Sequence, residues 1–317
     1  MDSFLYSLNA TVPVFLVMIA GGLLKKRGML TDAFVNVANK FVFQIALPCK
    51  LLLDLSGIDI IHNFDIKYIG FCFCVTLVSI LTIWVLARKL LKDPSETGAF
   101  VQAAYRSSAA ILGVAFIENI YGNSGMAPLM MIGSVPLYNI FAVVVLTFEN
   151  PDNHGDAKAK IMKAVKGVVT NPIILSIFAG IILSLLNIQL PTMLYKAVNN
   201  LGIMASPLAL LAIGAGFEGR KALAKIKPTA AASFIKLVLL EAIFLPMAVA
   251  LGFRDQKLLA LIIMLGSPTT PTAYIMAKNM GGDDVLTSSV VVLTTMLSAV
   301  TLTFWIFCAR YFGFLAG

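Results

Sequence analysis

The sequence predicts an all-α integral membrane protein with ten transmembrane helices, arranged as two inverted repeats of five helices. Three observations support this fold class. The 317 residues are 59% hydrophobic and 13% charged, which leaves too few polar residues to cover a soluble globule. Apolar stretches of about 20 residues, the length that crosses a bilayer as a helix, recur along the whole chain. The two halves of the chain also share residues at one constant spacing.

The ten expected spans follow one another, separated by short polar connections. The first should be a retained helix rather than a signal peptide, because Lys25, Lys26 and Arg27 follow its apolar core without a small-residue cleavage site. We therefore expect a multi-pass protein of the plasma membrane, with the lipid bilayer as its permanent partner. The spans cover approximately residues 4–24, 36–55, 66–90, 98–120, 124–148, 167–187, 192–217, 229–252, 256–278 and 284–314.

Basic residues gather in alternate connections, which sets the expected orientation. Cytoplasmic loops of membrane proteins carry an excess of Lys and Arg, so the connections after spans one, three, five and seven should be cytoplasmic and both termini outside. Membrane topology thereby explains the net charge of +8, and no nucleic-acid partner is expected. The residues concerned are Lys25, Lys26, Arg27, Arg88, Lys89, Lys92, Lys158, Lys160, Lys163, Lys166, Arg220, Lys221, Lys225 and Lys227.

An internal repeat links the two halves of the chain. The longest polar connection, 149–166, is the expected linker between a first repeat, 1–148, and a second, 167–317. Pro13 and Pro172 differ by 172 − 13 = 159 positions. The same offset relates Ala20 to Ala179, Gly21 to Gly180, Pro48 to Pro207, Gly57 to Gly216, Ser108 to Ser267 and Gly122 to Gly281. Because each half has an odd number of spans, the second copy enters the membrane from the opposite side, as in many secondary transporters.

Span nine contains two prolines within one helical turn near its middle, Pro268 and Pro271. Each proline lacks an N–H and its ring crowds the carbonyl four residues earlier, so together they should end the helix. Unpaired backbone at this depth is tolerated only where it is buried in protein or lines a watered cavity. Broken helices at the midplane are the usual binding sites of secondary transporters. The alternative is a simple kink relieved by the hydroxyls of Ser267, Thr269 and Thr270.

Span four is the repeat partner of span nine and has weak helix formers, Ser107, Ser108 and Gly113, at the equivalent depth. If both spans break, half-helices that restart near the midplane present free N–H groups and a partial positive charge, which together favour an anion. Arg106 lies near mid-span, where an arginine should face a cavity or a partner, and its fork suits a carboxylate. Arg106 can instead extend toward the cytoplasm or bond carbonyls at its own helix break.

Polar residues in other spans complete the candidate site. The substrate-binding residues predicted are Arg106, Ser107, Ser108, Asn139, Ser267, Pro268, Thr269 and Thr270. Asn139 is equally explained as a hydrogen-bonding residue between helices. Glu241, near the centre of span eight, is the candidate for proton or cation coupling, with a structural bond to a neighbouring helix as the alternative. Lys236 is five residues away, on a different face of a regular helix, and Lys50 with Asp54 should form a local ion pair.

Enzymatic chemistry is not expected. The chain has no plausible Ser/His/Asp set, no phosphate-cradling glycine loop and no sizeable soluble domain. Its four cysteines lie within apolar runs, and its two histidines, His62 and His154, lie in polar connections. These positions support neither a disulfide framework nor a metal site, and no cofactor is expected.

Several stretches distributed along the chain form a recognisable set of motifs. They are Asn39 to Pro48, Arg106-Ser107-Ser108 with Ile111-Leu112-Gly113, Asn171-Pro172-Ile173-Ile174, Pro191, Leu201 to Gly214, and Ala273-Tyr274-Ile275-Met276-Ala277-Lys278 with Gly282-Asp283. These stretches resemble the auxin efflux carrier family, the PIN-like transporters with many bacterial members, and the likeness covers nearly the whole chain. Ser108 and Ala115 depart from the family, which often has asparagine and proline there, so the break in span four is expected to be milder.

The resemblance implies a scaffold of spans one, two, six and seven. The other spans would form a transport domain whose broken spans four and nine cross at the midplane. Family members move organic anions, auxin in plants and small carboxylates such as malate or malonate for bacterial relatives. The plant proteins are dimers, which implies a homodimer through scaffold helices. We therefore expect a secondary carrier of a small organic anion, with a carboxylate as the expected group, that works by elevator-type alternating access. The alternatives are a sodium-coupled symporter of the related bile-acid type and a ligand sensor without transport.

Overall fold

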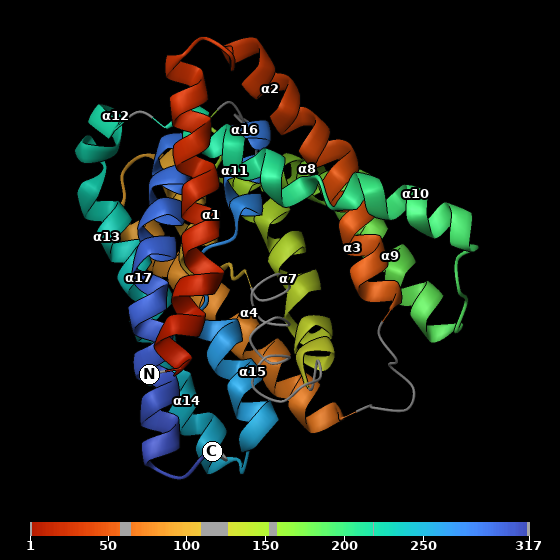
Figure 1. Cartoon of the computed structure of the whole chain (residues 1–317), viewed down its shortest axis with the longest axis vertical. Helices are drawn as coiled ribbons and strands as arrows, with labels where there is room; N and C mark the ends of the chain where they lie inside the picture. Colours follow the sequence, from red (N-terminus) through yellow and green to blue (C-terminus); the bar gives the residue numbers. More distant parts are fainter. Residues whose placement is uncertain (1, 58–64, 109–125, 152–156, 218, 316–317) are drawn as a thin grey trace.

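A computed structural model of the chain describes residues 2–57, 65–108, 126–151, 157–217 and 219–315, and every regular element in these ranges is a helix (Figure 1). By length and composition, five helices can span a bilayer, or up to seven if two bent helix pairs each count as one span. A multi-pass helical membrane protein is thus confirmed, whereas the count of ten spans stays a prediction. The five single helices are Ile66–Leu90, Ala127–Phe148, Thr192–Gly216, Ile226–Ala250 and Asp284–Tyr311.

The first half of the chain contains six described α-helices and one π-helical turn. Three of the helices begin where a side chain accepts a hydrogen bond from a free N–H group of the first turn: Thr31 for α2, Asp65 for α4 and Asp93 for α5. The elements are α1 (Asp2–Lys26), α2 (Asp32–Phe41), η1 (Val42–Ala46), α3 (Leu47–Ser56), α4 (Ile66–Leu90), α5 (Pro94–Tyr105) and α7 (Ala127–Phe148).

The second half begins with α8, which starts at Ala157, so part of the expected linker is helical. A second π-helical stretch, η3, separates α13 from α14. The elements are α8 (Ala157–Thr170), α9 (Pro172–Leu185), α10 (Thr192–Gly202), α11 (Ala205–Gly216), α12 (Gly219–Ala224), α13 (Ile226–Phe234), η3 (Ile235–Leu239), α14 (Leu240–Ala250), α15 (Asp255–Gly266), α16 (Pro271–Met280) and α17 (Asp284–Tyr311).

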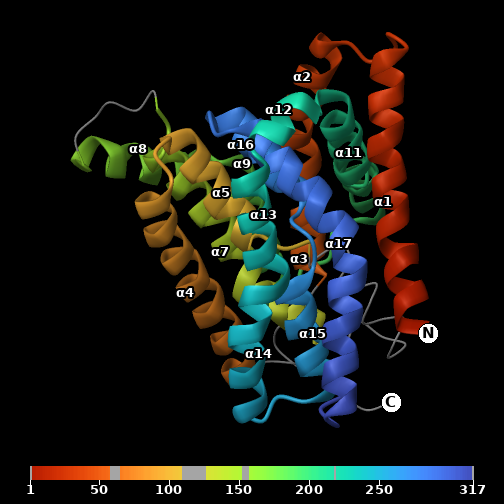
Figure 2. The same ribbon diagram turned by 90° about the vertical axis from the view of Figure 1, so that its left-hand side faces the viewer.

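Two helix pairs pack through glycines. α1 packs against α11, and α3 packs against α9 (Figures 1 and 2). A Cβ atom on Gly180 of α9 would lie 2.8 Å from the Leu52 carbonyl oxygen, and one on Gly21 of α1 would lie even closer to that of Leu211. Small residues allow the backbones of membrane helices to approach closely in this way. Any larger side chain at these two positions would separate the helices.

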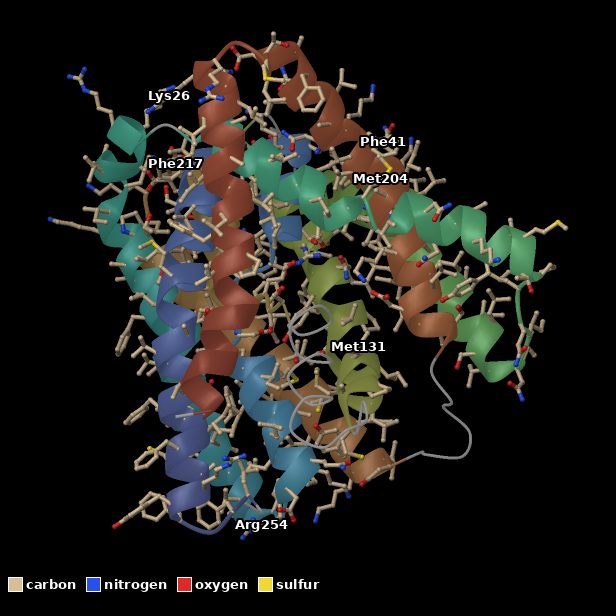
Figure 3. All side chains as sticks on the ribbon, in the orientation of Figure 1. Lys26, Phe41, Met131, Met204, Phe217 and Arg254 are labelled. Carbon is tan, nitrogen blue, oxygen red and sulfur yellow. The ribbon has the colours of Figure 1, made fainter. Side chains whose placement is uncertain are left out.

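The outer surface is apolar and the interior contains charged groups, the reverse of a soluble protein. Large apolar side chains such as Met193, 89% exposed, and Phe307 project outward, as expected of a surface that faces lipid. Charged residues lie at the ends of the bundle, with Lys26 at one end and Arg254 at the other (Figure 3). The few charges deep inside therefore need an explanation, and they lie where the helices are interrupted.

Candidate functional site

The helical segment from Asp255 to Met280 is interrupted near its middle. α15 ends at Gly266, residues 267–270 are not helical, and α16 begins at Pro271 with its axis bent by 40° from that of α15. Pro271 occupies the first position of α16, where its missing N–H is not needed for a helical bond. The Thr270 hydroxyl oxygen caps α16 by accepting a hydrogen bond from the Thr272 N–H at 3.4 Å. The two predicted proline positions, Pro268 and Pro271, thus lie inside this interruption and at its end.

Residues 106–108 lie against this interruption. α5 ends at Tyr105 and is followed by extended backbone at Arg106. The Ser108 N–H donates to the Pro268 carbonyl oxygen at 3.0 Å, a backbone bond between two segments far apart in sequence. The Ser107 and Ser267 hydroxyls are also hydrogen-bonded to each other. Residues 106–108 and 267–270 therefore provide each other with one backbone and one side-chain hydrogen bond. The predicted break at Gly113 lies outside the described residues.

Thr269 connects the interruption to two other helices. Its hydroxyl donates to the Ala103 carbonyl of α5 at 2.7 Å, and its N–H donates to the Thr294 hydroxyl of α17 at 3.1 Å. Buried backbone in a membrane protein needs such internal partners. Thr269 therefore has a bonding role in fixing the shape of the break, and it does not line the pocket described below.

Arg106 is the charged group at the centre of this arrangement. It is 3% exposed, and its guanidinium donates to the Asn139 side-chain oxygen at 2.5 Å and to the Met276 sulfur at 2.8 Å. Asn139 is held in turn by a bond from its amide to the Val135 carbonyl oxygen at 2.9 Å. No carboxylate among the described residues forms an ion pair with Arg106. A guanidinium has five N–H donors, so Arg106 retains capacity for an anionic partner.

A pocket lies beside Arg106, between α3, α5, α7 and the start of α16. Of the predicted substrate-binding residues, Arg106, Ser107, Ser108, Asn139 and Thr270 line it, whereas Ser267, Pro268 and Thr269 do not. The remaining lining residues are Leu47, Lys50, Leu51, Asp54, Val135, Tyr138 and Thr272. The predicted Lys50–Asp54 ion pair is present at 3.0 Å. That it faces the pocket could not be read from the sequence, although a charged pair within a span is itself a signal of function.

The start of α16 adds a second positive feature to the pocket. Thr270 and Thr272, from the cap and first turn of α16, both line it. Although Pro271 has no N–H and the Thr272 N–H is capped by Thr270, the start of a helix carries a partial positive charge, which attracts anions. The pocket therefore combines a buried guanidinium, a helix N-terminus and several hydroxyl and amide groups. This set of groups suits a small anion with oxygen acceptors.

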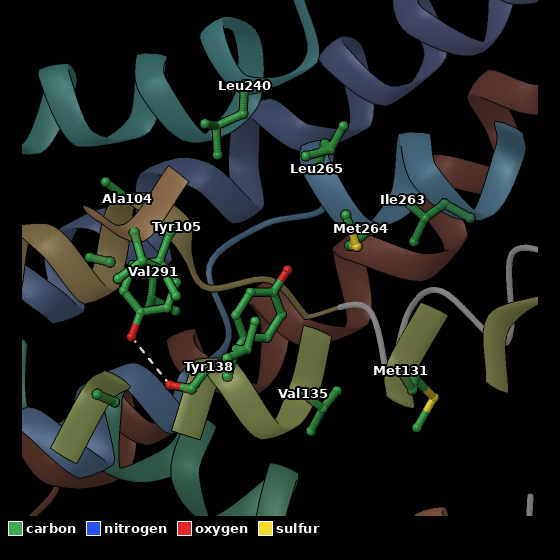
Figure 4. Packing of buried hydrophobic residues seen from close by; sticks show 14 of the residues in the cluster. Ala104, Tyr105, Met131, Val135, Tyr138, Leu240, Ile263, Met264, Leu265 and Val291 are labelled. Carbon is green, nitrogen blue, oxygen red and sulfur yellow. Dashed lines mark hydrogen bonds between the residues drawn. The ribbon is translucent and has the colours of Figure 1, made fainter. Parts of the chain in front are cut away.

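Two tyrosines fix the wall of the pocket next to Arg106. The rings of Tyr105 and Tyr138 are stacked with centroids 5.8 Å apart, and the Tyr105 hydroxyl donates to the Tyr138 carbonyl oxygen at 3.2 Å (Figure 4). Tyr138 precedes Asn139 on α7, so this contact ties the end of α5 to the turn that holds the Arg106 partner. The position of the guanidinium is thereby set from two helices.

Glu241 lies on the opposite side of the interruption, away from the pocket. It is fully buried, and a Cβ atom on Gly266 would overlap its carboxylate. Lys236 is also fully buried and bonds to the Leu265 carbonyl oxygen. The expectation that Lys236 and Glu241 lie on different faces was wrong, because Lys236 lies within η3, whose wider π-helical turn brings residues five apart toward the same side. Both groups therefore lie against the end of α15, Lys236 at the Leu265 carbonyl oxygen and Glu241 beside Gly266.

Within the ranges that the structure describes, no three residues of the types His, Cys, Asp and Glu gather closely enough to hold a metal ion. Structural and catalytic metal sites use such groups of three or four ligands. The charged groups at the interruption are an arginine, two lysines, an aspartate and a glutamate, and they are divided between its two sides.

Comparison with known proteins places the chain in a family. A family described as "Membrane transport protein" matches residues 6–306. An "Uncharacterized transporter" of Methanothermobacter thermautotrophicus is 22% identical over 306 residues, covering 95% of this chain and 98% of the relative. The "Uncharacterized transporter YfdV" of Escherichia coli K12 is 22% identical over 310 residues, covering 94% and 96%. The "Putative malonate transporter" of Rhizobium meliloti is 26% identical over 295 residues, covering 86% of each chain.

These matches extend over nearly the full length of the chain, as did the resemblance to the auxin efflux carrier family. The chain belongs to this family of membrane transport proteins, and the predicted resemblance is confirmed. The family and these relatives are transporters rather than enzymes, which points against an enzymatic activity.

Proposed function

We propose that this membrane transport protein is a secondary carrier of a small organic anion that carries a carboxylate, and that the pocket beside Arg106 binds it. The observation that carries the proposal is the state of Arg106. It is buried at the pocket, bonded to an amide oxygen and a sulfur, and has no carboxylate partner among the described residues. An arginine at this depth is costly without a partner. An anionic substrate would supply that partner in each transport cycle.

The chemistry of the pocket favours a carboxylate over other small ligands. A guanidinium pairs with the two oxygens of a carboxylate through parallel hydrogen bonds, which are stronger than bonds between neutral groups. The partial positive charge at the start of α16 would attract a further oxygen of the same ligand. The relative from Rhizobium meliloti that is named for malonate, a small dicarboxylate, supports the same class.

Packing supports the inverted repeat that the mechanism needs. Gly21 lies against Leu211, and Gly180 lies against Leu52. Both pairs are related by the predicted offset, since 180 − 21 = 159 and 211 − 52 = 159. The close contact of span one with span seven is therefore repeated by span six with span two, as two inverted copies would require. We accordingly propose repeats at 1–148 and 167–317, joined by the 149–166 linker.

The proposed mechanism is elevator-type alternating access. Spans one, two, six and seven, which share these glycine contacts, would form the scaffold, with a homodimer through its outer helices. The remaining spans would move as a transport domain, with broken spans four and nine crossing at the substrate. The first turns of α1 and the last turns of α17 lie at the same end of the bundle (Figures 1 and 2), which supports termini on one side. We assign that side to the outside of the plasma membrane.

A carboxylate panel tests this function. The purified full-length protein is heated with monocarboxylates, malonate and malate, and with malonamide as the uncharged match of malonate. A ligand present at 100 times its dissociation constant should add about 2.7 kcal/mol to the free energy of unfolding. We expect at least one carboxylate to raise the melting temperature and to accumulate in proteoliposomes, with no effect of malonamide. Equal effects of malonate and malonamide, or no uptake of any carboxylate, would contradict the proposal.

A further inference from the structure

Four buried polar side chains follow one face of the continuous helix formed by α13, η3 and α14. They are Thr229, Ser233, Lys236 and Glu241, each 2% exposed or less. Residues three or four apart lie on one face of an α-helix, which joins Thr229, Ser233 and Lys236. The five-residue step to Glu241 crosses the π-helical turn η3, which keeps Glu241 in the same line. We call these four residues the polar file.

Most of the polar file has no protein partner. The hydroxyls of Thr229 and Ser233 and both carboxylate oxygens of Glu241 make no hydrogen bond to any described residue. Buried polar atoms are nearly always hydrogen-bonded, so each exception needs an explanation. Four such atoms along one helix face indicate that the file bonds to water, which commonly fills polar sites inside proteins. A line of hydroxyls and water is a route for protons.

The two ends of the polar file lie at functionally different places. One helical turn before Thr229 lies Lys225, just before α13, which forms ion pairs with Glu96 and Asp283 at the end of the bundle. At the other end, Glu241 lies against Gly266, the last residue of α15 before the interruption. α13 and η3 pack against α17 along this path, whereas α14 packs against α15 (Figure 2). The file therefore connects one membrane face with the back of the interrupted segment.

Lys236 determines which cation can bind at the Glu241 end of the polar file. The last carbonyls of a helix carry a partial negative charge and favour a cation, and the Lys236 ammonium already bonds to the Leu265 carbonyl oxygen. A metal ion placed next to this ammonium group would be repelled. A proton, in contrast, binds directly to the Glu241 carboxylate, which is costly to bury in its ionised form without a partner.

Resting on the proposed function, we propose that the polar file is the proton pathway of this carrier, with Glu241 as the proton-binding group and Lys236 in the place of a sodium ion. In one cycle an O–H bond forms on Glu241 with a proton that water donates at one membrane face, and it breaks to water in the opposite state. The elements packed against η3 are α5, α13, α14, α15 and α17. Among the described titratable groups of these elements and of η3 itself, Lys236 is the charged group next to Glu241.

The first test needs no substrate. The infrared band of a protonated carboxyl group is recorded for the full-length protein in lipid and assigned by its loss in Glu241→Gln. The rate at which this band shifts in deuterated water is then measured for the wild type and for two double variants. Thr229→Val with Ser233→Ala removes both hydroxyls. Thr229→Ser with Ser233→Thr keeps both hydroxyls and is the matched control. We expect exchange about tenfold slower in the variant without hydroxyls, the effect of one lost hydrogen bond, and no change in the control.

A second measurement tests the role of Lys236 through sodium. The melting temperature of the wild type should be the same in sodium and in choline salts, whereas Lys236→Met, which frees the carbonyl end of α15, should be stabilised by sodium. Three results would overturn the inference: no carboxyl band assignable to Glu241, an unchanged exchange rate without the hydroxyls, or specific stabilisation of the wild type by sodium. Neither readout uses a carboxylate substrate, so failure of the proposed function is detected separately by the carboxylate panel.

Discussion

The two sides of the interruption between α15 and α16 each contain a buried charged group. The two groups differ in sign and in whether they have hydrogen-bond partners. On one side Arg106 has partners in Asn139 and Met276 and faces a pocket with the start of α16. On the other side Glu241 has no partner among the described residues, next to the end of α15. A helix start attracts negative charge and a helix end attracts positive charge. One break in one helix can therefore provide both an anion site and a proton site, back to back.

Removing the break should have the largest effect, because it removes both sites. In the double variant Pro268→Ala with Pro271→Ala, residues 267–270 can become helical and join α15 to α16. We expect transport to fall below detection in proteoliposomes. The variant should still fold, because helical bonds gained at residues 267–270 replace bonds that the interruption makes. Pro13→Ala, which replaces a proline inside the continuous helix α1, is the matched control and should retain transport. Full activity of the double variant would favour a simple kink.

Removing the charge on the pocket side should have a smaller effect. Arg106→Ala removes a charged donor that the substrate is proposed to bind, and hydrogen bonds to charged groups contribute about 1.5–3 kcal/mol, or roughly 10- to 100-fold in kcat/KM. Arg106→Lys keeps the charge but loses the fork, so it should fall between the wild type and Arg106→Ala. Arg310→Ala, at an exposed position in the last turn of α17, is the control. Equal uptake by Arg106→Ala and the wild type would remove Arg106 from the site.

The smallest effect is expected for an ion pair that lies outside the Arg106 pocket and the polar file. The hydrogen bond from Lys257 lowers the pKa of Asp65, which caps α4. Because the folded-state pKa is lowered, the stabilisation is present above the ordinary aspartate pKa of about 3.9 and is lost as the pH falls through the folded value. Both side chains are partly exposed, so Lys257→Ala should cost at most about 1 kcal/mol at pH 7. Melting curves at pH 7 and pH 3 check this, and a loss that persists at pH 3 would contradict it.

The sequence predicted local features of the site better than distant contacts. Pro268 and Pro271 mark the interruption because a missing N–H acts within one helical turn. The spacing of Lys50 and Asp54 likewise predicted their ion pair. The bond from Ser108 to Pro268 depends on how two distant spans pack, which no local pattern encodes. The alignment of Lys236 with Glu241 was missed because no residue type signals the π-helical turn between them.

An experimental structure with a bound carboxylate tests the central claim most directly. The protein is prepared with the member of the carboxylate panel that stabilises it most. The account predicts that the carboxylate lies between the Arg106 guanidinium and the first turn of α16, within hydrogen-bonding distance of both. A ligand bound elsewhere with the Arg106 pocket closed, for example in the polar pocket near Asn187 and Gln189, would contradict the account.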